Sequence, residues 1–329
     1  MKLATYRSES RDGRLIVVSR NLQRAVDASD IAPDLLSALE HWEVAAPLLQ
    51  QRYEALNADP PGAGFSFEVD SCAAPLPRPS QWIDGSDFPN HGHWVCKALG
   101  IPALASAAPL MYQGGTDDMR GATQDLILPD ESLDIDLEGE VVAVLGDVPM
   151  GVSEEDATKH IKLLMLANDC SLRALQAQEM QSGFGMIRAK PSTSFSPVAV
   201  SLDEVKPWWI QNRLHRKMQV HRNGEWIGNP DASLMKRGFG PLIAHAAYTR
   251  RLRAGTLLGS GTVSGPDDFA GSAAIAEIRG MEIEKHGEAR TPYLRFGERV
   301  RIEMLDDEGQ SIFGAIDQRI ARQFPGGVV

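Results

Sequence analysis

Two glutamates stand one residue apart in DLEGEVVAVLGD, residues 136–147, immediately before an apolar run. Side chains i and i+2 of an extended strand project to the same face, so Glu138 and Glu140 are predicted neighbours. Adjacent carboxylates repel each other unless water screens them or a cation lies between them. The pair is therefore either solvated on a half-exposed strand or part of a cation site.

A third acid favours the cation site. Asp169 directly follows the apolar run IKLLMLAN, residues 161–168, where burial of an unpaired carboxylate is costly. Three carboxylates that enter a core together can bind a hard cation. No Cys or His pairing accompanies them, so their oxygens favour Mg²⁺, Mn²⁺ or Ca²⁺ over zinc.

Strands are predicted to position these acids. Residues 133–149 alternate in polarity and then become continuously apolar, which is typical of a strand that enters a core. Residues 218–228 predict a hairpin with Asn223-Gly224 at its turn. We therefore expect an α+β, mainly β domain with helices packed outside it.

Two further segments are interpreted from local signals. Ser153 stands three residues before Asp156, which resembles a capping box and predicts a helix start at the head of residues 153–180. Residues 254–268 are interpreted as a glycine-rich turn region, because no helix pattern follows them and no dinucleotide or Walker spacing is present.

Residues 1–78 are predicted to form a small N-terminal domain, and residues 79–329 a larger catalytic domain. Within the first, residues 34–56 carry apolar side chains at helical spacing, and ADPPGAG, residues 58–64, ends that helix. The proline-rich AAPLPRPSQ, residues 73–81, marks the expected boundary.

Composition excludes several classes of protein. The chain has 33 basic and 44 acidic residues, a formal net charge of −11, so nucleic acid is a poor candidate partner. Cys72, Cys96 and Cys170 form neither a disulfide framework nor a zinc pattern. The N-terminus lacks the apolar segment of about 7–15 residues that a signal peptide needs. No run approaches the roughly 18 apolar residues of a membrane span. We expect a cytoplasmic protein without a membrane partner.

Four segments in order carry a family resemblance: LEGEVVAVLGD, ANDCSLRALQ, RAKPSTSFSP, and GSGTVSG followed by AAIAEI. They resemble the signature segments of the fumarylacetoacetate hydrolase family over roughly residues 80–280, and their order is more specific than any one of them. The resemblance implies that family's mixed β-sheet roll. It also implies a divalent ion, Mg²⁺ or else Ca²⁺ or Mn²⁺, held by Glu138, Glu140 and Asp169.

The segment WIDGSDFPNHGHW, residues 82–94, resembles the part of the fumarylacetoacetase branch that supplies a further metal ligand and a catalytic histidine. Asp84 stands seven residues before His91 and is the preferred ligand. Asp87 matches the local dipeptide better but fits the distance to the histidine less well, so both stay open.

Other site roles also follow from the resemblance. Glu277, fifteen residues after Thr262, corresponds to the glutamate partner of the histidine, and the run after it is interpreted as a strand. Lys190 would join His91 and Glu277 in catalysis. The residues implied to contact the substrate are Tyr112, Gln176 and Thr262.

Each of these roles has a structural alternative. His91 could belong to a surface loop, Glu277 could face solvent, and Lys190 could lie in an exposed basic turn. Tyr112 could be a plain core residue, and Thr262 could serve only a tight turn.

The chain departs from the family pattern at two substrate positions. Leu99 stands where an arginine is expected, with Lys97 nearby as a candidate replacement, and Ser86 lies where a tyrosine is expected. These departures concern the substrate more than the metal chemistry.

The resemblance implies hydrolysis of a carbon–carbon bond in a 1,3-diketo acid, such as fumarylacetoacetate or an acylpyruvate, in aromatic and tyrosine catabolism, by a homodimer. One alternative is an isomerase, hydratase or decarboxylase of a 2-oxo acid that uses the same metal without the His–Glu pair. Another is a non-catalytic protein in which Ca²⁺ only stiffens the fold.

Overall fold

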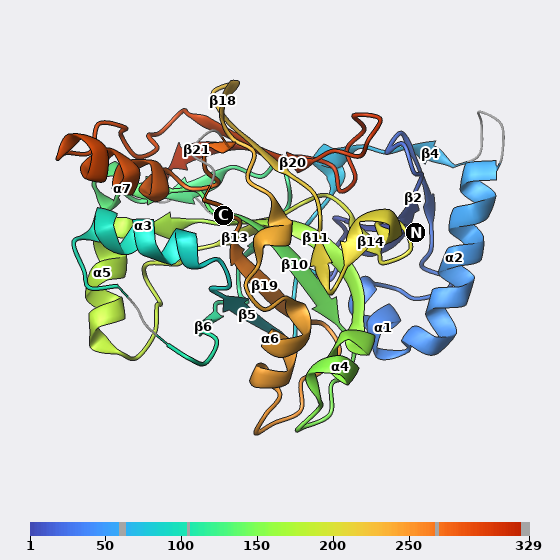
Figure 1. Cartoon of the computed structure of the whole chain (residues 1–329). Coiled ribbons are helices and arrows are strands. Elements are labelled where there is room, and N and C mark those ends of the chain that lie inside the picture. The colour runs from blue at the N-terminus through green and yellow to red at the C-terminus, as the bar shows by residue number, and fades with distance from the viewer. Residues whose placement is uncertain (59–63, 104–105, 267–269, 324–329) are drawn as a thin grey trace.

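The computed structural model describes residues 1–58, 64–103, 106–266 and 270–323. Within these residues a twelve-stranded sheet forms the centre of the molecule, with helices around it (Figure 1). Its main path runs β4-β3-β2-β1-β14-β11-β10-β19-β5-β6; off this path, β13 pairs with β11 and β7 pairs with β13. The α+β, mainly β class expected from the sequence is confirmed.

The elements have the following bounds. The strands of the large sheet are β1 (Lys2–Tyr6), β2 (Arg14–Val18), β3 (Arg24–Asp27), β4 (Phe65–Ser66), β5 (Gln81–Gly85), β6 (Met111–Gly114), β7 (Met119–Arg120), β10 (Gly139–Leu145), β11 (Ile161–Asp169), β13 (Thr193–Phe195), β14 (Ala199–Ser201) and β19 (Thr256–Thr262). A second sheet contains β18 (Glu225–Gly228), β17 (Met218–Arg222), β20 (Arg299–Met304), β21 (Ile316–Arg322) and β8 (Leu126–Leu128). Two short pairs are β9 (Ile135–Asp136) with β12 (Ser171–Leu172), and β15 (Trp209–Ile210) with β16 (Arg213–Leu214). The helices are α1 (Leu35–Glu40), α2 (Trp42–Ala58), α3 (Pro89–Leu99), α4 (Glu154–Ala157), α5 (Arg173–Ser182), α6 (Phe239–Ala246) and α7 (Ile275–His286).

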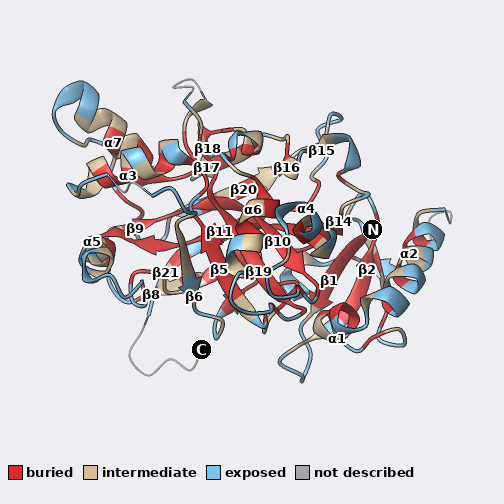
Figure 2. Ribbon diagram, turned by 60° about the horizontal axis from the view of Figure 1, so that its bottom comes forward, coloured by how far each residue is buried: buried red, intermediate tan, exposed pale blue. Residues whose placement is uncertain are grey.

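The central strands are buried on both faces, which explains their nearly continuous apolar sequences (Figure 2). Along β10, Val141 and Ala143 pack into one hydrophobic core, and Val142 and Val144 pack into another. The large sheet therefore separates two cores, because successive side chains of a strand point to opposite faces.

The N-terminal strands continue the large sheet. β1 pairs antiparallel with β14, with Lys2 opposite Val200 and Leu3 opposite Ala199. α1 and α2 lie at this end of the molecule (Figure 1). Leu3 and Leu49 share one hydrophobic core with Val142 of the central strand β10. The large sheet and this core thus contain residues from both sides of the expected domain boundary between residues 78 and 79. The division of the chain into two domains at this boundary stays a prediction.

The helical pattern over residues 34–56 corresponds to two helices, because the helical conformation is interrupted at His41, between α1 and α2. Asp34 caps the first helix, and its side chain accepts a hydrogen bond of 2.7 Å from the Ser37 amide. α2 ends at Ala58, and most of ADPPGAG lies outside the described residues.

Two of the local interpretations are corrected. Ser153 does cap α4, since its hydroxyl accepts from the Asp156 amide at 3.1 Å, but the helix lasts one turn. The apolar run that follows is the central strand β11, and its continuous apolar sequence is typical of a strand that is buried on both faces. Within the glycine-rich region, Thr256–Thr262 likewise form the buried strand β19 rather than a turn.

The predicted hairpin is confirmed as β17 and β18. Both turn residues have positive φ, 53° at Asn223 and 82° at Gly224, as a type I′ turn requires.

Candidate active site

Neighbouring strands bring three acids together at the centre of the large sheet. Asp84 lies on β5, Glu140 on β10 and Asp169 at the end of β11. One carboxylate oxygen from each lies within 4.8 Å of the other two. All three side chains are buried, and Glu140 is 0% exposed. We call these residues the acid group.

β19 separates β10 from β5 and leaves room for the acid group. A β-carbon at Gly259 would lie 2.3 Å from Asp84 Oδ1 and 2.8 Å from Glu140 Oε2. Gly259 also pairs with Asp84 in the parallel register between β19 and β5. Glycine is therefore required here by the close approach of two carboxylates.

Two carboxyls of the acid group, those of Asp84 and Glu140, have raised pKa values. Burial and the nearby Asp169 raise the pKa of Asp84 to about 7. Burial and the neighbouring Asp84 and Asp169 raise the pKa of Glu140 well above its ordinary range. Among the described residues, neither carboxylate oxygen of Glu140 has a hydrogen-bond partner. Such orphaned oxygens, together with the space left by Gly259, fit a hard divalent cation.

Glu138, next to β10, faces three basic side chains. Its Oε2 lies 2.5 Å from Lys190 Nζ, and its Oε1 lies 2.7 Å from Arg173 Nη2 and 3.3 Å from His91 Nε2. Burial would raise the pKa of Glu138, but Lys190 and Arg173 hold it well below its ordinary range. Glu138 is outside the acid group, and its role as a metal ligand stays a prediction.

Lys190 joins Glu138 to the acid group. Its Nζ lies 2.6 Å from Asp169 Oδ2, which also accepts a hydrogen bond of 2.5 Å from the Tyr112 hydroxyl. Thr193 Oγ1 donates to the other Asp169 oxygen at 2.8 Å. Burial would lower the pKa of Lys190, but Asp169 and Glu138 raise it above its ordinary value. The ammonium therefore stays charged at neutral pH.

His91 on α3 and Glu277 on α7 form a buried pair. His91 Nδ1 lies 2.6 Å from Glu277 Oε1, and the Ser272 hydroxyl donates to Glu277 Oε2 at 2.6 Å. Burial would lower the pKa of His91, but its hydrogen bonds to Glu138 and Glu277 raise it to about 9. Glu277 fixes the orientation of the ring and leaves Nε2 directed toward Glu138.

The segment after Glu277 is a helix, which corrects the predicted strand. The Asp136 carboxylate accepts hydrogen bonds from the first amides of α7, at 2.7 Å from Ile275 and 2.9 Å from Ala276. An acid at a helix N-terminus satisfies free amides and favours the helix dipole. α7 then packs against α3 so closely that a β-carbon at Gly280 would lie 2.3 Å from the Trp94 carbonyl oxygen.

Arg173 connects the two halves of the site. It donates from Nε to Asp136 at 2.9 Å, from Nη1 to Gln176 Oε1 at 2.7 Å and from Nη2 to Glu138 at 2.7 Å. The Gln176 amide group is thereby oriented with its carbonyl toward Arg173. The sequence analysis missed Arg173 and Asp136, although one stands three residues before Gln176 and the other two before Glu138, the spacings that place side chains on one face.

Thr262 is buried and pairs with Glu140 across β19 and β10. Asp87 lies apart from the acid group, because its carboxylate accepts hydrogen bonds from Arg237 and from the Gly238 amide. Lys97 forms an ion pair with Glu284 on the surface. Sequence reasoning also passed over Ser272 and Thr193, which are common residue types without a distinctive spacing.

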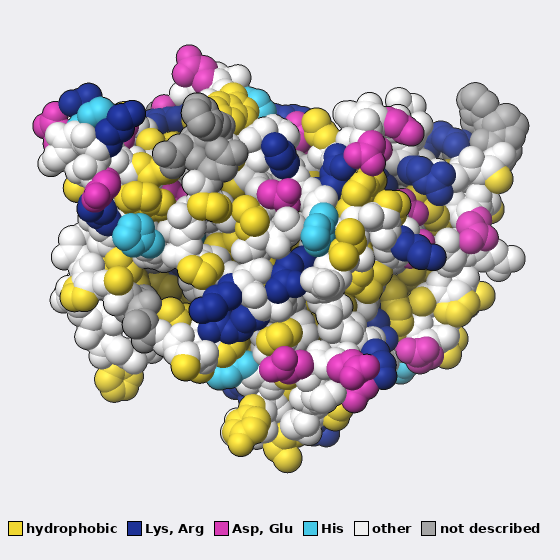
Figure 3. All heavy atoms as spheres, in the orientation of Figure 1, with side chains coloured by type: hydrophobic (Ala, Val, Ile, Leu, Met, Phe, Trp, Pro, Cys, Tyr) yellow, Lys and Arg dark blue, Asp and Glu magenta, His cyan; other side chains and the backbone are white. Residues whose placement is uncertain are grey.

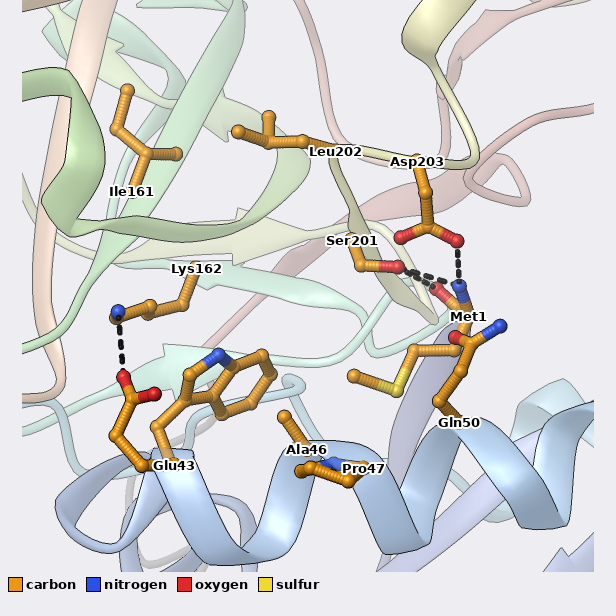
Figure 4. Close-up of a pocket in the computed structure, with 11 residues that line it drawn as sticks. Met1, Glu43, Ala46, Pro47, Gln50, Ile161, Lys162, Ser201, Leu202 and Asp203 are labelled. Atoms are coloured by element: carbon orange, nitrogen blue, oxygen red, sulfur yellow. Dashed lines mark hydrogen bonds and ion pairs between the residues drawn. The ribbon is translucent and has the colours of Figure 1, made fainter.

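A cavity lies elsewhere in the molecule (Figure 4). It has a volume of about 650 Å³ and lies between α2 and the start of β11, with Lys162 directed toward Glu43 and the Met1 amino group directed toward Asp203. Asp169 is at the opposite end of β11, roughly 25 Å away at about 3.3 Å per residue. No group of acids like that at Asp169 lines this cavity.

A group of carboxylates that could hold a cation thus lies beside a buried His–Glu pair and a buried lysine. The model for "Fumarylacetoacetate (FAA) hydrolase C-terminal" matches residues 84–321, and that for "Fumarylacetoacetase N-terminal domain 2" matches residues 1–78. The chain belongs to the fumarylacetoacetate hydrolase family.

The names of similar proteins describe different activities. "Oxaloacetate tautomerase fahd2, mitochondrial" of Xenopus laevis is 25% identical over 272 residues, 82% of each chain. "2,4-didehydro-3-deoxy-L-rhamnonate hydrolase" of Sphingomonas sp. is 26% identical and covers 60% of this chain and 68% of its own. The structure of maleylpyruvate hydrolase from Sphingobium sp. SYK-6 with manganese(II) and pyruvate has a TM-score of 0.67 at 15% identity, over 98% of this chain and 100% of that one. No helix among the described residues is long and apolar enough to span a membrane.

Proposed function

We propose that the chain is a metal-dependent hydrolase that cleaves a carbon–carbon bond in a 1,3-diketo acid, of the fumarylacetoacetate or acylpyruvate type. The observation that carries this proposal is the buried His91–Glu277 pair next to the acid group. Hydrolysis needs a base for water, and a histidine oriented by a carboxylate is such a base. A site that only binds Ca²⁺ for stability needs neither this pair nor Lys190.

The proposed ligands of the ion are Asp84, Glu140 and Asp169. A bound Mg²⁺, Mn²⁺ or Ca²⁺ would polarise the substrate oxygens as a Lewis acid and orient the diketone. In its neutral form His91 would accept a proton of the attacking water at Nε2, while Glu277 stabilises the protonated ring; the raised pKa of His91 means that this form increases as pH rises toward about 9. The bond between the attacked carbonyl carbon and the methylene carbon then breaks, and its electron pair stays with the methylene carbon as an enolate.

The leaving enolate needs fixed positive potential, because its negative charge develops in the transition state. The Lys190 ammonium is held by Glu138 and Asp169, within the site. The Gln176 carbonyl accepts from Arg173, so its amide nitrogen remains the donor available to the substrate. His91 would finally return its proton to the methylene carbon, which completes the proton balance.

The tautomerase and isomerase names among the relatives favour a second candidate, a proton shift in a 2-oxo acid on the same site. Such a reaction needs a base and the ion but no attacking water. Glu277→Gln distinguishes the two: retained turnover of a 2-oxo acid, with loss after Glu140→Gln, supports the second candidate. A cytoplasmic homodimer in aromatic catabolism stays a prediction from the family resemblance.

The decisive test is the rate of enol absorbance loss with fumarylacetoacetate and a panel of acylpyruvates, with and without Mn²⁺. We expect metal-dependent hydrolysis by the native chain. His91→Ala should lower kcat by about 10²–10⁴-fold, the usual contribution of a positioned base. Its Mn²⁺ affinity should change little, because His91 is outside the acid group.

His286→Ala is the matched control, since this histidine is exposed at the other end of α7. It should behave like the native chain. An unimpaired rate in His91→Ala, or hydrolysis that EDTA leaves unchanged, would contradict the proposed mechanism.

A further inference from the structure

A second cavity, of about 170 Å³, is lined by several sequence neighbours of the candidate site residues. Two of the residues that line it lie two positions from site residues: Ser86 follows Asp84, and Leu110 precedes Tyr112. The Ser86 amide donates to the Leu110 carbonyl at 2.8 Å, which continues the pairing of β5 with β6. Gly92, the neighbour of His91, also lines this cavity.

One wall of this cavity is basic. Lys236 and Arg237 line it, as does His93 from α3, and none of the described lining residues is acidic. This is notable in a chain whose formal net charge is −11. On the face shown in Figure 3, several Lys and Arg side chains gather near the middle, with Asp and Glu side chains scattered around them.

The backbone of the basic wall is fixed by hydrogen bonds. The Lys236 amide donates to the Asp87 carbonyl at 2.8 Å, and the Lys236 carbonyl accepts from Arg213 at 3.0 Å. Arg237 is bound by the Asp87 carboxylate, through its guanidinium at 3.0 Å and its amide at 2.7 Å. The Asp87 side chain is 0% exposed and thus acts as the buried anchor of this wall.

The two cations of the wall differ in what they can offer a ligand. Arg237 is paired with Asp87, and it also donates to the Ala107 carbonyl at 3.2 Å. Lys236 is exposed, and among the described residues its ammonium has no hydrogen-bond or ion-pair partner. A cation whose backbone is fixed and whose charge is unpaired is preorganised for an anion.

We propose that this cavity binds the distal carboxylate of a dianionic diketo acid, and that Lys236 selects substrates that carry such a group. This assignment deepens the proposed function and rests on it. A water molecule takes about 30 Å³ of the liquid, so the cavity has room for a short carboxylate arm. Asp87 acts here as a positioning residue for the wall.

The binding test uses two acids of equal length that differ in one terminal carboxylate, succinate and butyrate. Calorimetric titration of the Mn²⁺-loaded full chain should show succinate binding about fivefold more tightly than butyrate, as an accessible ion pair allows. Lys236→Gln should abolish this preference. Lys206→Gln is the control for net charge, because Lys206 is exposed and lies outside the cavity.

The kinetic test compares succinylpyruvate with butyrylpyruvate. The ratio of their kcat/KM values should fall about fivefold in Lys236→Gln, by a rise in KM for succinylpyruvate, and should be unchanged in Lys206→Gln. Equal affinities of succinate and butyrate for the native chain, or a preference that survives Lys236→Gln, would overturn the inference. If no diketo acid is hydrolysed but the preference for succinate still depends on Lys236, the proposed reaction is wrong and the carboxylate site stands.

Discussion

The carboxylates of the acid group are close enough to repel one another. They fit together because the residue next to them is a glycine, which has no side chain. Gly259 faces Asp84 and Glu140 at distances that no β-carbon could share. The repulsion appears as raised pKa values of both carboxyls. A divalent ion would relieve this repulsion, because it is an opposite charge within the same small volume.

Gly259→Ala should therefore remove the ion site without touching His91 or Lys190. We expect Mn²⁺ affinity to fall at least about 10-fold, since displaced carboxylates no longer converge. Calorimetric titration measures the affinity, and circular dichroism with thermal melting of the metal-free variant reports whether the sheet is retained. Native Mn²⁺ affinity in a folded Gly259→Ala variant would argue against this placement of the ion.

At the scale of elements, the helices α3 and α7 carry the His91–Glu277 pair, and three contacts hold these helices in place. Asp136 fixes the first turn of α7, and Arg173 ties Asp136 to Glu138. Gly280 lets α7 approach the α3 backbone. The distance between His91 and Glu277 is thus set by packing between helices rather than by the sheet.

Gly280→Ala should separate α3 from α7, because the added methyl group would overlap the Trp94 carbonyl. We expect a loss of stability of about 1–3 kcal/mol, as for other overpacked contacts. We expect kcat to fall at least about 10-fold, because small misplacement of a catalytic base is costly. Mn²⁺ affinity should persist, in contrast to Gly259→Ala. Lys285→Ala, exposed on the same helix, is the control and should leave all three quantities unchanged.

From the sequence, the residues of this site were easier to predict than the strands and helices that carry them. Of the three acids predicted to share an ion, Glu140 and Asp169 lie together in the acid group, whereas Glu138 lies outside it. The metal-binding roles of all three stay predictions. The strand β11 was placed within a helical segment, since its continuous apolar run has no alternation to mark it. The α7 segment was assigned to a strand because its N-terminal cap, Asp136, comes from a distant part of the chain. The choice between Asp84 and Asp87 likewise required their three-dimensional partners.

For the whole molecule, the acid group and the buried histidine link stability to pH. A carboxyl whose pKa is higher in the folded state binds its proton more tightly there. The pKa of Asp84 is raised from 3.8 to about 7, so its contribution is lost as pH rises through that value. The pKa of His91 is raised from 6.5 to about 9, so its contribution is present below about 6.5 and is lost as pH rises through 9.

The metal-free protein should therefore melt at a lower temperature at pH 8 than at pH 5. Added Mg²⁺ should raise the melting temperature more at pH 8, because its carboxylate ligands are then deprotonated. Scanning calorimetry with EDTA or with Mg²⁺ measures both effects. Asp84→Asn is the control, and its metal-free form should lose less stability between the two pH values. A Mg²⁺ effect equal at both pH values would disagree with the acid group as its binding site.

The pairing of β1 with β14 affects how the protein folds during its synthesis. Leu3 meets a strand nearly two hundred residues later, and β5 and β10, which carry two residues of the acid group, are joined only when β19 pairs with both. A ribosome must therefore release most of the polypeptide before the first strand finds its neighbour. Contacts between such distant segments make folding slow. During that interval the edge of β1 that pairs with β14 has no partner, and an unpaired strand edge favours aggregation.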